Sequence, residues 1–104
     1  MQETTLLQHD TILVSRLRLA PGEATPWLRD VCHRVTVIVS GDVIAIEYPD
    51  GGEAQRYGVS PGLAEWDIPM ARVHRAVNVG EQAYEQISVF FLDRPDTVPQ
   101  PRVE

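Results

Sequence analysis

The chain has 104 residues, enough for one domain with a single modest core. Its formal net charge of -6 argues against a nucleic-acid partner, because proteins that bind a phosphate backbone gather Lys and Arg on one face. The sequence contains no lysine, which excludes a Schiff-base lysine, a P-loop lysine and an ammonium general base.

The single cysteine, Cys32, cannot form an intramolecular disulfide and fits a reducing compartment. The first residues carry no positively charged segment. No apolar run approaches the roughly 20 residues that a membrane helix needs. We therefore expect a soluble, cytoplasmic protein that binds neither nucleic acid nor membrane.

In chain order, the first clear element is Thr11 to Ala20, where leucines alternate with arginines as in a half-buried strand. Pro21-Gly22 predicts a turn, and a weaker strand follows at Thr25 to Asp30. Val35 to Val39 is a β-branched run suited to a strand covered on both faces. Further strands are predicted at Val43 to Tyr48, Glu53 to Val59, Leu63 to Ile68, Val73 to Val79 and Tyr84 to Leu92.

No segment shows the apolar spacing of a helix. About eight short strands with turns between them predict an all-β fold, and a jelly-roll barrel is the closed form at this size. We expect residues 1–92 to form the barrel domain. Asp93 to Glu104, which holds three prolines, is expected to form an extended C-terminal tail.

The stretch Pro69 to Asn78, read as P-M-A-R-V-H-R-A-V-N, places one histidine, His74, in a strand-like alternation. Its Pro69, His74 and Asn78 match the second motif of the cupins, with Ala71 in place of a glycine. Pro21-Gly22 and Gly41 frame the first cupin motif, and Thr25-Pro26-Trp27 is similar to the segment that precedes the metal-binding histidines. The chain therefore resembles the small single-domain cupins, whose fold is an RmlC-like jelly roll.

The resemblance implies a metal bound by two histidines and a glutamate of the first motif and the histidine of the second. Counting from the two glycines places Leu28 at the first histidine, Asp30 at the second and Arg34 at the glutamate. Leucine offers no lone pair, and a guanidinium brings a permanent positive charge to the expected cation position. We therefore expect a degenerate metal site and prefer no cofactor.

A substituted metal site remains an alternative. Asp30 and Cys32 could join His74 to hold a divalent ion such as Zn, Fe, Mn or Ni. A one-residue bulge would instead bring His33 inward.

Without a metal, the expected pocket has a chemical character of its own. Asp30 and Arg34 share a nominal strand face, so an internal ion pair near His74 is one outcome. A contact of Arg34 and His74 with a ligand carboxylate is another. The predicted ligand-binding residues are Trp27, Leu28, Asp30, Arg34, Trp66 and His74, whereas Glu65 and Asp67 are expected on a solvated outer face.

Two functional classes stay open. The first is a cupin that binds a small polar or carboxylate-bearing molecule in the barrel. The second is a metal-dependent cupin enzyme of the dioxygenase or isomerase type. We also expect a homodimer formed through the N-terminal strand at Thr4 to Leu7 and an exposed sheet face, because Phe90-Phe91-Leu92 and this strand carry more apolar residues than a thin barrel needs.

Overall fold

The computed structural model describes residues 1–95 of the chain. These residues form nine strands and no helix, so they include no helix able to cross a membrane. The all-β prediction is confirmed. The strands are β1 (Gln2–His9), β2 (Ile12–Leu19), β3 (Leu28–Asp30), β4 (Cys32–Ser40), β5 (Val43–Glu47), β6 (Gln55–Gly58), β7 (Ala64–Asp67), β8 (Met70–Asn78) and β9 (Tyr84–Pro95).

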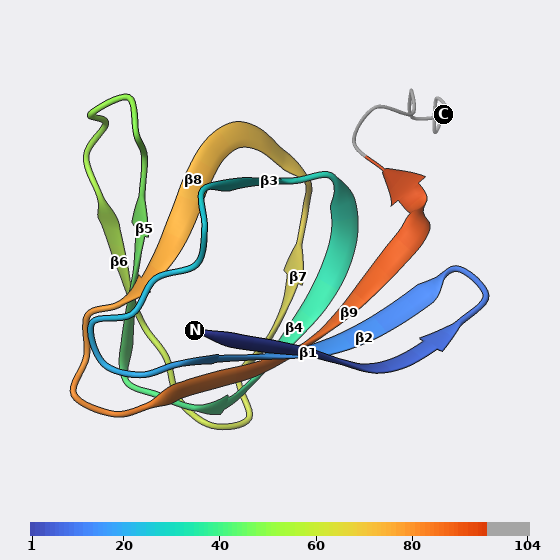
Figure 1. The fold of residues 1–104 in the computed structure, drawn as a ribbon, viewed down its shortest axis with the longest axis horizontal. Coiled ribbons are helices and arrows are strands. Elements are labelled where there is room, and N and C mark those ends of the chain that lie inside the picture. The colour runs from blue at the N-terminus through green and yellow to red at the C-terminus, as the bar shows by residue number, and fades with distance from the viewer. Residues whose placement is uncertain (96–104) are drawn as a thin grey trace.

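The strands form two antiparallel sheets that face each other (Figure 1). The larger sheet has the order β1-β2-β9-β4-β7, and the smaller has the order β3-β8-β5-β6. From β2 onward the pairing is nested, because β2 pairs with β9, β3 with β8, β4 with β7 and β5 with β6. This nested pairing is that of the predicted jelly roll.

The two ends of the chain add to this barrel. β1 pairs with β2 in a hairpin that projects from one side of the barrel, and its turn includes Asp10 with a φ of 51° (Figure 1). The last strand continues past the expected boundary at Leu92 and ends at Pro95. The rest of the predicted tail, residues 96–104, lies outside the described residues.

The core lies between the sheets and contains the leucines predicted for it. Leu17 and Leu19 of β2 are buried, and they pack with Ile38, Ile44 and Tyr84. Arg18, on the other face of β2, is exposed and pairs with Glu85. The alternation in the sequence therefore gave the correct inner face for this strand.

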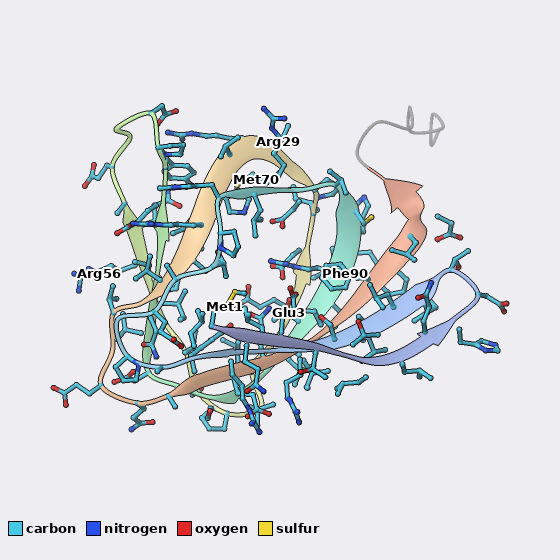
Figure 2. The ribbon with its side chains drawn as sticks, viewed as in Figure 1. Met1, Glu3, Arg29, Arg56, Met70 and Phe90 are labelled. Atoms are coloured by element: carbon cyan, nitrogen blue, oxygen red, sulfur yellow. The ribbon has the colours of Figure 1, made fainter. Side chains whose placement is uncertain are left out.

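Polar side chains also point inward. Asn78 is fully buried, and its side-chain amide donates to the carbonyl oxygens of Leu19 and Gln82 at 3.0 and 2.8 Å. Figure 2 shows Glu3 and Phe90 projecting between the sheets, whereas Arg29 and Arg56 point away from the barrel. The hydrophobic core therefore fills only part of the space between the sheets. Polar side chains reach the rest of that space, where a binding site can form.

Candidate functional site

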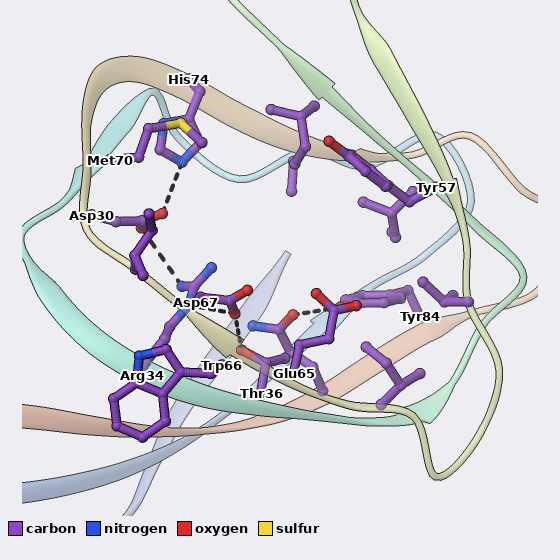
Figure 3. A pocket seen from close by; sticks show the side chains of 17 residues that line it. Asp30, Arg34, Thr36, Tyr57, Glu65, Trp66, Asp67, Met70, His74 and Tyr84 are labelled. Atoms are coloured by element: carbon purple, nitrogen blue, oxygen red, sulfur yellow. Dashed lines mark hydrogen bonds and ion pairs between the residues drawn. The ribbon is translucent and has the colours of Figure 1, made fainter.

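A cavity of about 340 Å³ lies between the two sheets, next to the hydrophobic core (Figure 3). Its volume is within the range of small-molecule sites. Apolar side chains line it together with charged and polar ones, and Figure 3 shows Met70 beside His74 and Tyr84 beside Glu65. The apolar and aromatic lining residues are Ile38, Ile44, Ile46, Val59, Ile68, Met70 and Ala76, together with Tyr57 and Tyr84.

His74 points into this cavity, as its match to the histidine of the second cupin motif implied, and is only 5% exposed. Its Nδ1 lies 2.7 Å from the carbonyl oxygen of Arg72, which can only accept a hydrogen bond. Nδ1 therefore carries a hydrogen, and Nε2 is the ring nitrogen that faces the interior. Nε2 lies 3.2 Å from Oδ2 of Asp30.

Arg34 lies between two carboxylates. Its Nε donates to Oδ2 of Asp67 at 3.2 Å, and its Nη1 lies 3.6 Å from Oδ1 of Asp30. Asp67 also accepts a 2.7 Å hydrogen bond from the Thr36 hydroxyl. The side chains of His74, Asp30, Arg34, Asp67 and Thr36 thus form one continuous polar chain along the wall of the cavity (Figure 3).

The structure corrects the prediction for Glu65 and Asp67, which line the cavity and do not lie on an outer face. Asp67 pairs with Arg34 and Glu65 pairs with Thr36 across β7 and β4, and directly paired residues share one face of a sheet. Because Arg34 and Thr36 face inward, their partners do so as well. The polar residues of β4 were the signal in the sequence for an inward polar surface.

The two tryptophans occupy different places. Trp27 does not line the cavity, and this part of the prediction is wrong: it precedes β3, is 43% exposed, and its ring packs 4.4 Å from the Arg75 guanidinium. Trp66 borders the cavity, but its ring stacks on Phe91 at 5.2 Å and its Nε1 donates to Nδ1 of His33 at 3.0 Å. The indole of Trp66 therefore lies mainly on the outer face of the larger sheet.

Leu28 borders a second, smaller cavity of about 100 Å³. Leu28 pairs with His74 across β3 and β8, which places it beside the histidine as the cupin resemblance implied. Asp30, Arg34 and His74 are among the residues that line both cavities, so they stand between them. The structure therefore brings together Leu28, Asp30, Arg34 and His74 from the predicted set.

The residues present do not fit a metal ion. No group of three or more His, Cys, Asp or Glu side chains able to hold a metal occurs among residues 1–95. Asp30 does reach His74, but His33 is held by Trp66, so the bulged alternative with an inward His33 is wrong. The Arg34 guanidinium pairs with Asp30 beside the histidine, so a permanent cation is already in this position.

No family model matches the sequence. No curated protein matches it either. Solved structures do match its fold. A cupin domain from Bordetella pertussis Tohama I aligns over 86% of this chain and 90% of its own, with a TM-score of 0.74 and 19% identity.

Two further structures give the same result. A cupin superfamily protein from Desulfitobacterium hafniense DCB-2 aligns over 88% of this chain and 77% of its own, with a TM-score of 0.63 and 17% identity. The polyketide cyclase RemF from Streptomyces resistomycificus aligns over 89% of this chain and 66% of its own, with a TM-score of 0.65 and 22% identity. At these identities the likeness concerns the fold alone, and that fold is a cupin jelly roll.

Proposed function

With a small cupin barrel as the premise, we propose that this chain binds a small polar organic molecule in the cavity between its sheets, without a metal. The observation that supports this proposal is the cavity of about 340 Å³ beside His74, whose lining combines a chain of connected polar side chains with aliphatic ones. Concave sites with mainly apolar walls and a few convergent polar groups are the usual form of small-molecule sites.

Of the two ligand classes that the sequence left open, the polar class has more support than the carboxylate class. Arg34 is the one guanidinium that lines this cavity among the described residues, and it already contacts Asp30 and Asp67. A ligand carboxylate would share this guanidinium with Asp30 and Asp67 and would bring a third negative charge beside them, which costs free energy.

The test is ligand binding with one variant that narrows the cavity and one that does not. Met70 lines the cavity from β8, whereas the neighbouring Ala71 is exposed and does not line it. We expect at least one compound in a panel of small polyols, amides, amino alcohols and carboxylates to raise the Tm of the wild type and of Ala71→Trp. The same compound should fail to raise the Tm of Met70→Trp.

Two results would contradict the proposal. One is that no compound in the panel shifts the Tm of the wild type, or that Met70→Trp responds as the wild type does. The other is elemental analysis of protein purified without chelator that finds a stoichiometric metal, lost in His74→Ala. That result would support the metal-dependent enzyme instead.

A further inference from the structure

We infer that the ligand of this cavity carries a positively charged amine on an apolar body, and that Glu65 is the residue that binds the amine. This inference rests on the proposed function, because it assigns a ligand class to the same cavity. It follows from which charges in the cavity already have partners, and from where the remaining charge lies.

The charges that line the cavity are unequal in number. Three carboxylates face it, from Asp30, Glu65 and Asp67, against the one guanidinium of Arg34 and the imidazole of His74. Asp30 contacts both His74 and Arg34, and Asp67 contacts Arg34 and Thr36. The single positive charge of the guanidinium is therefore already shared by two carboxylates.

Glu65 is the carboxylate left over. It makes no hydrogen bond and no ion pair in the described part of the chain, although its strand partner Thr36 is tied to Asp67 and Ser88. Figure 3 shows its carboxylate turned toward the side of the cavity where Tyr57 and Tyr84 lie. An ammonium group next to Glu65 would gain a charge-assisted hydrogen bond and could also contact the face of an aromatic ring.

A second observation, independent of the carboxylates, points to a ligand with an apolar body. Several large apolar residues that line the cavity are exposed to solvent, with Ile68 at 68%, Tyr57 at 49% and Met70 at 36%. Apolar surface gathered in a concave site marks a place where something binds. A molecule with a hydrocarbon chain or ring would cover these side chains while its amine contacts Glu65.

The experiment compares three probes of equal chain length, namely hexylamine, 1-hexanol and hexanoate, by isothermal titration calorimetry at neutral pH. With the wild type we expect hexylamine to bind about tenfold more tightly than 1-hexanol, the gain of one charge-assisted hydrogen bond, and hexanoate to bind most weakly. Added salt should weaken the binding of hexylamine and leave that of 1-hexanol unchanged.

Two variants then distinguish the effect of the Glu65 charge on hexylamine binding from the effect of the net charge of the protein. Glu65→Gln should lose the preference for hexylamine, a decrease of about tenfold in its affinity, and keep the affinity for 1-hexanol. Glu53→Gln changes the net charge by the same amount, but Glu53 is exposed and does not line the cavity, so it should behave as the wild type. Because Glu65 is itself exposed, the glutamine variant should fold as the wild type does.

The two proposals fail in different ways. If hexylamine binds no more tightly than 1-hexanol, or if Glu65→Gln and Glu53→Gln have equal effects, the amine inference is wrong while the cavity remains the binding site. If hexylamine fails to bind the wild type but a neutral compound of the panel binds, the inference is equally wrong. If no compound of either set binds, the proposed function itself is wrong.

Discussion

Asp30 changes the chemistry of the histidine beside it. The cupin resemblance implies a histidine at this position, and that second imidazole would leave room for a cation between the two rings. The carboxylate of Asp30 instead contacts Nε2 of His74 at 3.2 Å and Nη1 of Arg34 at 3.6 Å. A position that could have supplied a metal ligand therefore holds an internal network of charges, which orients the polar wall of the cavity.

Tyr84 is the residue whose ionisation should be visible in the pH dependence of stability. Burial raises the pKa of its phenol, the charge of Arg34 opposes this, and the charges of Asp67 and Glu65 add to it. The pKa of tyrosine in an unfolded chain is about 10. Because the folded-state pKa is higher, the protonated phenol contributes fully to the free energy of unfolding below about pH 10. This contribution is lost as the pH rises above that value.

We therefore expect the free energy of unfolding of the wild type to fall between about pH 10 and pH 11.5, and to fall less steeply in Tyr84→Phe. At pH 8 the variant should be less stable by about 1 kcal/mol, because it loses the hydrogen bond from its hydroxyl to Gln86. Urea unfolding at each pH measures both effects. Equal slopes for the two proteins would show that Tyr84 does not cause the alkaline loss.

At the scale of elements, one side chain joins two turns of the barrel. Asp42, between β4 and β5, accepts hydrogen bonds from the backbone N–H groups of Val43 and Glu81, each at 3.0 Å. Glu81 belongs to the turn between β8 and β9, so the contact joins turns far apart in the sequence. These backbone donors, that of Glu81 first, hold the pKa of Asp42 below its usual value.

We expect the contact between the two turns to need a glycine at position 80. A Cβ atom on Gly80 would overlap the Asp42 carboxylate. Gly80→Ala should lower the Tm by several degrees, about the effect of 1 kcal/mol in a domain of this size. It should cost much less when Asp42→Ala is also present, because the overlap is then removed. Gly58→Ala is the control, since a Cβ at Gly58 meets nothing within 4 Å. Additive effects of the two substitutions, measured by thermal unfolding, would disprove the overlap.

At the scale of the whole molecule, the outer face of the larger sheet carries an apolar row of side chains that lacks a covering layer in the described chain. Adjacent strands place Val14, Val89, Val35 and Trp66 in one row, and neither Val35 nor Val89 is fully buried. The net charge of -6 disfavours contact between copies elsewhere on the surface, whereas this uncharged row suits a symmetric contact with itself. We propose that a second copy covers this face.

Light scattering at micromolar concentration should then give the mass of a dimer, and Val89→Glu should give that of a monomer. Val31→Glu is the control, because Val31 is 56% exposed and lies in the link between β3 and β4, outside the paired strands that carry this row. A monomer mass for the wild type, or the same shift in both variants, would contradict the proposal.

The sequence by itself determined the strands and the jelly-roll class, because alternation with a period of two is a local property of the chain. The inward direction of His74 was predicted from the match of Pro69 to Asn78 to the second cupin motif, not from alternation. It also predicted an ion pair between Asp30 and Arg34 as one possible outcome, since both residues were placed on one face.

Only the tertiary structure decided which side chains of the short strands point into the barrel. In β7 the alternation of Trp66 with Glu65 and Asp67 favoured an inward indole and carboxylates on the outer face, but both carboxylates line the cavity and Trp66 is 49% exposed. Alternation shows which residues share a face, whereas pairing with another strand decides whether that face is inside. Arg34 and Thr36 of β4 provide partners for Asp67 inside the barrel, and that pairing between distant segments cannot be read from β7 alone.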